Sequence, residues 1–370
     1  MHTNKRIFGL DLLRFAAIIL VLIAHTFYLL SSRNIVYITS TYAAVMGVEL
    51  FFVLSGFLIG TILVKINEQQ NQITFKILKD FWIRRWFRTL PNYYLILVVN
   101  LLVVILVTGA LPITGLKLLS FFVFMQDIAS VEQNQFFGVA WSLSVEEWFY
   151  LTFPLLLLLI RLIVKSKQSA VAIVGLIFLV APLLGRLILA IVSDIPWDGG
   201  FRKMTLIRLD SIGMGVLCAY LKYYYQEKWM RLRYWTGLSG LVLLVALLVV
   251  LYKTYLVGIN FRTGAEIAAP GFFVKTTWFT LLNLSIAMML PGFYYIKINA
   301  NGIIPRAITF VSLISYSVYL IHLLIVQLFL SVSGFSSGIT KVGGIWAVTI
   351  LLSAALYYGF ESRMTRLRDR

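Results

Sequence analysis

The chain has 370 residues, of which 60% are hydrophobic and only 13% are charged, and its mean hydropathy is +0.90. Soluble proteins carry about 25% charged residues, so this composition excludes a soluble globular protein. The formal net charge of +17 does not indicate a nucleic-acid partner. The basic residues fall in short segments between apolar runs, where membrane topology accounts for them. The single cysteine, Cys218, excludes an intrachain disulfide.

Apolar runs recur along nearly the whole sequence, and we predict an all-α polytopic integral membrane protein. The pattern predicts ten spans, at residues 7–30, 43–64, 88–109, 139–160, 169–192, 204–222, 234–252, 272–294, 308–331 and 343–360. Most Lys and Arg residues then lie on the inner side, so the positive-inside rule predicts that both termini are cytoplasmic. Two connecting stretches, 65–88 inside and 110–138 outside, are long enough to hold re-entrant or interfacial elements.

The first span contains two ionisable residues, Arg14 and His25, in the sequence FGLDLLRFAAIILVLIAHTFYLL. Their spacing puts both side chains on the same face of a helix, about 16 Å apart along its axis. An ionisable residue inside a membrane helix is costly and indicates a functional site. The pair would suit the two ends of a long substrate. Alternatively, Arg14 snorkels or pairs with Asp11, and His25 forms a hydrogen bond within the bundle.

Other ionisable residues are predicted at a depth similar to that of His25, in the outer half of the bundle. They are Glu49 in the second span, Glu146 and Glu147 in the fourth, and Arg208 and Asp210 in the sixth. Ion pairs that hold the bundle together, such as Glu49 with Arg208, would explain some of them but explain a histidine beside two glutamates poorly. His322, in the ninth span, would contact a substrate or bond to a neighbouring helix.

Three arginines, Arg84, Arg85 and Arg88, lie in the predicted inner loop immediately before the third span. The guanidinium fork pairs bidentately with phosphate, which indicates a phosphate-bearing ligand on the inner side. The topology signal alone is an equal explanation for this cluster. The sequence does not decide between Arg84 and Arg85 as the partner of Arg88 on one helical face. The three histidines and one cysteine show no ligand spacing, so we expect no metal site.

Several motifs together resemble the acyltransferase-3 family of integral membrane acyltransferases. The matching segments are LDLLRFAAIILVLIAH at 10–25, with ten residues between the arginine and the histidine, GVELFFVLSGFLIG at 47–60, FWIRRWFRTLPNYY at 81–94 and WSLSVEEWFYLTFP at 141–154. Weaker matches are IRLDSIGMGVLCAY at 207–220, ISYSVYLIH at 314–322 and YYGFES at 357–362. Their order along the chain is that of the family.

The resemblance implies a single transmembrane domain over residues 1–370, without a fused extracytoplasmic domain, in a bacterial cytoplasmic membrane. It implies acyl-CoA, most simply acetyl-CoA, as a cytoplasmic co-substrate rather than a tightly bound cofactor. The acceptor would be a hydroxyl of a cell-envelope carbohydrate or glycolipid.

Particular residues take roles under this resemblance. Arg14 and the 84–88 cluster would hold the donor, and His25 would remove the hydroxyl proton, since its unperturbed pKa is about 6.5. Glu146 would orient the imidazole, while a covalent acyl-histidine is the rival route. The residues expected on the acceptor side are Glu49, Glu147, Arg208, Asp210 and His322.

Two other functions remain open at this point. Buried charges are also found in transporters, although the chain shows no inverted repeat and no paired broken helices. A lipid, a peptide or a small metabolite would serve as the acceptor through the same chemistry. The sequence leaves the acceptor, the length of the acyl chain and the oligomeric state open.

Overall fold

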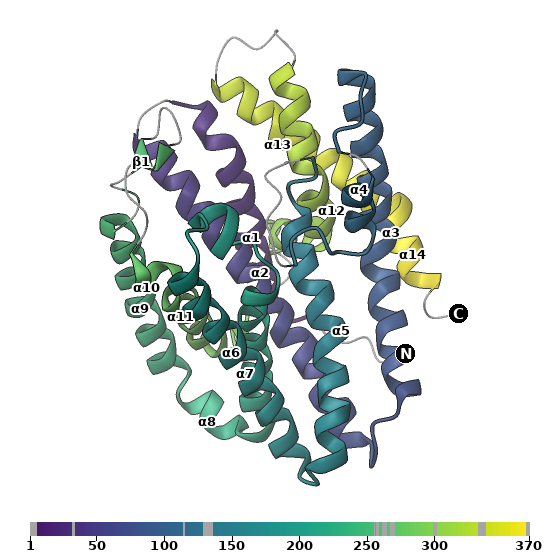
Figure 1. Ribbon diagram of the computed structural model, residues 1–370, viewed down its shortest axis with the longest axis vertical. Helices are drawn as coiled ribbons and strands as arrows, with labels where there is room; N and C mark the ends of the chain where they lie inside the picture. Colours follow the sequence, from purple (N-terminus) through teal and green to yellow (C-terminus); the bar gives the residue numbers. More distant parts are fainter. Residues whose placement is uncertain are drawn as a thin grey trace. The chain divides into compact units, whose positions relative to one another are not determined.

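The computed structural model describes residues 6–31, 34–113, 115–128, 136–254, 256, 259–260, 265–266, 271–298, 302–331 and 338–367 (Figure 1). Nearly all secondary structure in these residues is helical. The exception is one antiparallel pair of two-residue strands, β1 (Ile259–Asn260) and β2 (Ala265–Glu266). The prediction of an all-α polytopic membrane protein is confirmed.

Within the described residues, eight helices are long and apolar enough to cross a membrane. They are α1 (Phe8–Thr26, continued by a short helix at Phe27–Leu29), α2 (Asn34–Gln69), α3 (Phe75–Thr108), α5 (Ala140–Ile163), α6 (Lys167–Val192), α9 (Arg233–Thr254), α12 (Ile303–Ser331), and α13 (Gly338–Leu356), which continues through Tyr357–Glu361 into α14 (Ser362–Leu367).

The two other predicted spans, 204–222 and 272–294, also contain helices, α7 (Leu209–Tyr224) and α11 (Thr277–Tyr294). At about 1.5 Å per residue each is shorter than the roughly 30 Å hydrocarbon core. The count of ten spans is therefore not confirmed, and the side of the membrane on which each terminus lies stays a prediction.

The third span begins earlier than the hydropathy pattern predicts. Helix α2 ends at Gln69 and α3 begins at Phe75, so most of the expected inner loop 65–88 is helical. The three arginines therefore lie inside α3, and not in a loop before it. Charged and aromatic side chains are compatible with a helix, so α3 begins several turns before its apolar part. Gly109, with φ of 71°, then ends α3 in a left-handed cap.

The remaining connections contain shorter helices. The predicted outer stretch 110–138 contains α4 (Leu116–Phe122), and residues 114 and 129–135 of that stretch lie outside the described part. Helices α8 (Gln226–Arg231) and α10 (Phe272–Lys275) precede α9 and α11, and two short helical turns, Trp197–Phe201 and Leu206–Arg208, precede α7.

The chain divides into two compact units. The first consists of Met1–Ser55, Leu221–Ala268 and Leu281–Ala354, and the second of Gly56–Tyr220, Ala269–Thr280 and Ala355–Arg370. We describe each unit by itself. The prediction of a single domain over residues 1–370 is not tested by this division.

In the first unit, α1 packs along α12. The Ser312 hydroxyl donates to Asp11 at 2.8 Å, and farther along both helices the rings of His25 and His322 lie 5.1 Å apart. Residue numbers rise along both helices between these contacts, so α1 and α12 run in the same direction, as the predicted topology requires. Gly9 allows the close approach of α11, because a Cβ there would lie 1.7 Å from the Phe293 carbonyl oxygen.

In the second unit, glycine also permits a close helix contact. A Cβ at Gly56 of α2 would lie 2.0 Å from the Ile212 carbonyl oxygen of α7. This contact joins the SGFLIG and SIGMG segments through small residues, as is common where membrane helices pack closely.

Candidate active site

The first cluster of ionisable residues lies in the first unit, on α1. The Asp11 carboxylate is buried and receives two bonds from Arg6, at 2.7 and 3.0 Å, besides the one from Ser312. Arg14 lies one turn farther along, with its guanidinium 3.7 Å from Asp11 and its side chain 20% exposed. The predicted pairing of Arg14 with Asp11 therefore exists, but it is the longest of these contacts.

Two histidines meet at the other end of the same helix pair. The rings of His25 on α1 and His322 on α12 have their centroids 5.1 Å apart and are tilted by 47°. His322 is 1% exposed, and its Nδ1 lies 2.7 Å from the carbonyl oxygen of Tyr319, one turn earlier in α12. His322 therefore bonds to its own helix rather than to a neighbouring one. Glu49, on α2 in the same unit, is 1% exposed.

The second cluster joins α3 and α5 in the second unit. Arg85 donates to the Glu146 carboxylate at 3.3 Å and to the Tyr150 hydroxyl, whose own proton goes to Glu146 at 2.7 Å. The Arg85 guanidinium also lies over the Tyr150 ring, 4.2 Å from its centroid. Glu146 is thus fixed by two partners that belong to its own unit.

Glu147 also contacts α3, but it accepts hydrogen bonds from other residues of that helix. Trp86 Nε1 donates to one carboxylate oxygen at 3.1 Å, and the Thr89 hydroxyl donates to the other at 3.0 Å. Near these, Trp82 Nε1 donates to the Tyr150 carbonyl oxygen at 2.9 Å. These partners were not predicted from the sequence. Their spacing on α3 at residues 82, 85, 86 and 89 marks one helical face and was the signal available.

The other two arginines of α3 differ from Arg85 in their exposure. Arg84 and Arg88 are both exposed, whereas Arg85 lies in the contact with α5. Arg88 nevertheless lies close enough to Arg85, Glu146 and Glu361 to interact with their charges, so it belongs to the surroundings of the same cluster. Exposed guanidinium groups can bind the phosphates of a large anion. One turn beyond Arg88, Asn92 donates to Glu361, from the short helix before α14, at 2.9 Å.

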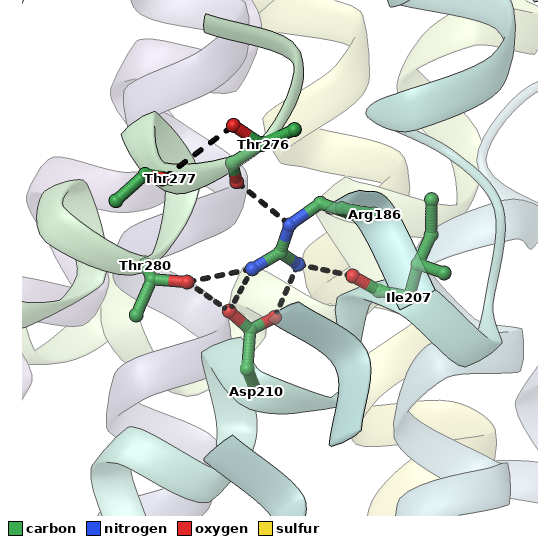
Figure 2. A network of polar contacts seen from close by, with 6 residues as sticks. All are labelled: Arg186, Ile207, Asp210, Thr276, Thr277 and Thr280. Carbon is green, nitrogen blue, oxygen red and sulfur yellow. Dashed lines mark hydrogen bonds and ion pairs between the residues drawn. The ribbon is translucent and has the colours of Figure 1, made fainter. Parts of the chain in front are cut away.

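Asp210 and its partner Arg186 are both fully buried and form the centre of a polar network in the second unit (Figure 2). Arg186 of α6 binds both of its carboxylate oxygens, at 2.6 and 2.9 Å, and Thr280 donates to it at 2.8 Å. The remaining Arg186 donors reach the Thr280 hydroxyl at 2.6 Å and the carbonyl oxygens of Thr276 and Ile207. Every donor of this arginine side chain thus has a protein partner, which indicates a structural clamp.

Arg208, next to this network, is 0% exposed, and its guanidinium lies 3.8 Å from the ring centroid of Phe279. The structure therefore places Arg208 and Asp210 in the buried interior of the second unit. Substrate binding by Glu49, Glu147, Arg208 and Asp210 stays a prediction. So does the orientation of His25 by Glu146, since those two residues belong to different units. In the part of the chain that the structure describes, no three His, Cys, Asp or Glu residues gather as metal ligands.

Comparison with known proteins gives one family match. A family model described as "Acyltransferase domain" matches residues 7–358. "Putative O-acetyltransferase SACOL0978" of Staphylococcus aureus (strain COL) is 30% identical over 224 residues, which cover 58% of this chain and 34% of that protein.

A second relative, "Peptidoglycan O-acetyltransferase OatA" of Listeria monocytogenes, is 30% identical over 184 residues, which cover 47% of this chain and 28% of that protein. The aligned stretches thus span about a third of the relatives' length. No solved structure is significantly similar to the chain.

The buried network of Arg186 and Asp210 makes one prediction. The substitution Asp210→Asn leaves a buried guanidinium without its counter-charge, so it should lower the free energy of unfolding by about 3–5 kcal/mol. We expect a lower thermal midpoint and yield in detergent. Asp198→Asn is the control, because its carboxylate is 49% exposed where it pairs with Arg202 and Lys203, and exposed ion pairs contribute about 0–1 kcal/mol each. A wild-type midpoint for Asp210→Asn would contradict the structural role.

Proposed function

The chain belongs to the acyltransferase-3 family, and we propose that it moves an acetyl group from cytoplasmic acyl-CoA to a hydroxyl of a cell-envelope carbohydrate or glycolipid. The family match confirms the resemblance drawn from the motifs. Buried ionisable side chains on apolar helices supply groups for such chemistry inside a membrane. The observation that carries the proposal most directly is the pair of imidazoles, His25 and His322, between α1 and α12.

The proposed donor is supported by the arginines. The phosphates of CoA are best met by guanidinium groups that keep donors available. Arg84 and Arg88 on α3 are exposed, and the Arg14 side chain on α1 is 20% exposed. We assign phosphate binding to these three residues. Arg85 takes a positioning role instead, since Glu146 and Tyr150 already engage it.

The proposed acceptor rests on the relatives. Their names specify O-acetylation, and one of them specifies peptidoglycan, so a saccharide hydroxyl is the acceptor class we propose. Because the chain matches only about a third of their length, the acceptor does not follow from the match alone. Acylation of a lipid, a peptide or a small metabolite would use the same residues and is decided by assay.

Two routes are open to His25. As a base, it would take the hydroxyl proton while the oxygen attacks the thioester carbonyl, and then give that proton to the departing CoA sulfur. As a nucleophile, it would first accept the acyl group on a ring nitrogen and then pass it to the hydroxyl. Both routes require the imidazole at position 25.

Substitution of His25 tests the proposal. The variant His25→Ala should remain folded in the membrane and lose acetyl transfer by a factor of about 100 or more. The measurement gives labelled acetyl-CoA and isolated envelope glycans to protein reconstituted in vesicles and reads acetylated glycan by mass. Unchanged turnover in His25→Ala would remove His25 from the chemistry. A wild-type protein that labels no acceptor would remove the enzymatic function itself and favour a transporter.

The exposed arginines of α3 make a separate prediction. Replacing Arg84 or Arg88 by Gln should raise the KM for acetyl-CoA about tenfold, since a charge-assisted hydrogen bond contributes about 1.5–3 kcal/mol. The kcat should change little, because the phosphates are distant from the reacting carbonyl. Arg306→Gln, at an exposed arginine of the first unit, is the matched control. An unchanged donor KM in both α3 variants would place the CoA phosphates elsewhere.

A further inference from the structure

His322 is held in one protonation form by its own helix. Its Nδ1 lies 2.7 Å from the carbonyl oxygen of Tyr319 and 3.3 Å from that of Val318. A carbonyl oxygen only accepts hydrogen bonds, so the Nδ1 atom must carry the hydrogen. The second ring nitrogen, Nε2, therefore bears a lone pair. The backbone of α12 thus fixes His322 as a hydrogen-bond acceptor at Nε2.

That acceptor is buried and unsatisfied. Nε2 of His322 has no hydrogen-bond partner among the described residues, and the side chain is 1% exposed. Leaving a buried polar atom without a partner is costly, and a catalytic role or a bound water, ion or ligand is among the reasons why a native protein does so. Nε2 of His322 therefore lacks a hydrogen-bond donor. A substrate hydroxyl is such a donor.

The unsatisfied atom belongs to the ring beside His25. The two centroids are 5.1 Å apart and both residues belong to the first unit. A hydroxyl bound to Nε2 of His322 would therefore lie close to an acyl group carried on His25. The pair supplies two different groups, one imidazole fixed as an acceptor and a second that reacts.

We propose that His322 Nε2 is the base that takes the proton of the acceptor hydroxyl, and that His25 carries the acyl group as an acyl-imidazole. This assignment rests on the proposed acetyl transfer and selects the second of the two routes open to His25. It changes His322 from a residue expected to bind substrate into a catalytic residue.

The steps balance in atoms and protons. First, a ring nitrogen of His25 attacks the thioester carbonyl; a C–N bond forms and the C–S bond breaks. The hydrogen on the other His25 nitrogen leaves with the sulfur as the CoA thiol. Next, the acceptor oxygen attacks the acyl carbon; a C–O bond forms and the C–N bond breaks. The hydroxyl proton goes to Nε2 of His322 and then to His25, where the nitrogen that lost its hydrogen in the first step regains one, so both rings return to their starting forms.

The hydrogen bonds of His322 explain why His322 is the base and His25 the nucleophile. An acylated His25 keeps a lone pair only on its other ring nitrogen, and the electron-withdrawing acyl group makes that nitrogen a weak base, so a second base is required for the acceptor. His322 suits that task, because the Tyr319 carbonyl stabilises the ring when Nε2 becomes protonated. It suits the nucleophile's task poorly. Acylation at Nε2 would yield a neutral product only if Nδ1 gave up the hydrogen that bonds to Tyr319.

Two substitutions of His322 separate its possible roles. In His322→Asn, the side-chain amide can replace Nδ1 as donor to Tyr319, so the structural bond is kept and the base is lost. In His322→Gln, the amide oxygen can reach the position of Nε2, so a hydrogen-bond acceptor is kept without a base. The thermal midpoints of both variants in detergent report whether they are folded.

Two reactions are measured on reconstituted protein. Exchange of labelled CoA into acetyl-CoA, without acceptor, reports formation of the acyl-enzyme. Transfer to isolated envelope glycans, read by mass, reports the second step. We expect His322→Asn and His322→Gln to keep exchange within about threefold of wild type and to lose transfer by about 100-fold or more. His25→Gln should lose both reactions.

Each other outcome overturns the assignment. Transfer near the wild-type rate in a folded His322→Asn variant would show that His322 is not the base. Recovery of transfer in His322→Gln would show that Nε2 only accepts a hydrogen bond. Loss of exchange in both folded variants, or exchange in His25→Gln, would reject the acyl-imidazole division. Failure of the wild-type protein to acetylate any glycan would instead reject the proposed function.

Discussion

The packing of α1 against α12 is the contact on which our account of the chemistry depends. It brings the His25 ring to 5.1 Å from His322 at one end, and it joins Asp11 to Ser312 at the other. The two helices run in the same direction, so α12 lies beside α1 over the whole distance from Arg14 to His25. A long donor that lies beside α1 would thus have its phosphates near one end and its thioester near the imidazoles.

Polar groups buried in an apolar bundle need hydrogen-bond partners. Whether the protein itself supplies those partners distinguishes the Asp210 network from the site at His322. Asp210 has both carboxylate oxygens occupied by Arg186 and Thr280, so the network is complete without a ligand. His322 has one nitrogen satisfied by its own helix and one left open. The first pattern indicates a clamp between helices, and the second indicates a site that a substrate completes.

Much of the architecture follows from the sequence, because an apolar run of sufficient length has few alternatives to a membrane helix. The placement of Arg14 and His25 on α1 follows from helical periodicity alone. Hydropathy predicted the start of α3 poorly, since it marks the apolar part of a helix and not its first turn. Helix α3 therefore takes in the arginines that were expected in a loop. Helices α7 and α11 lie within the two other predicted spans, and the count of ten spans stays a prediction.

Partners across helices were not predictable in the same way. The neighbour of Asp210 is Arg186, 24 residues earlier on α6, and nothing in the local sequence pairs them. The open nitrogen of His322 depends on a backbone hydrogen bond that residue types do not reveal. The face of α3 that meets Glu146 and Glu147 was visible in residue spacing, but its partner helix was not.

A double-mutant cycle in turnover tests the central claim, that the two imidazoles act as one catalytic unit. The kcat/KM for acetyl transfer would be measured in wild type, His25→Ala, His322→Asn and the double variant. Residues that act in one sequence of steps are strongly non-additive, so the double variant should be no slower than the slower single variant. Two losses that multiply in the double variant would show that His25 and His322 contribute independently, which would contradict a shared site between α1 and α12.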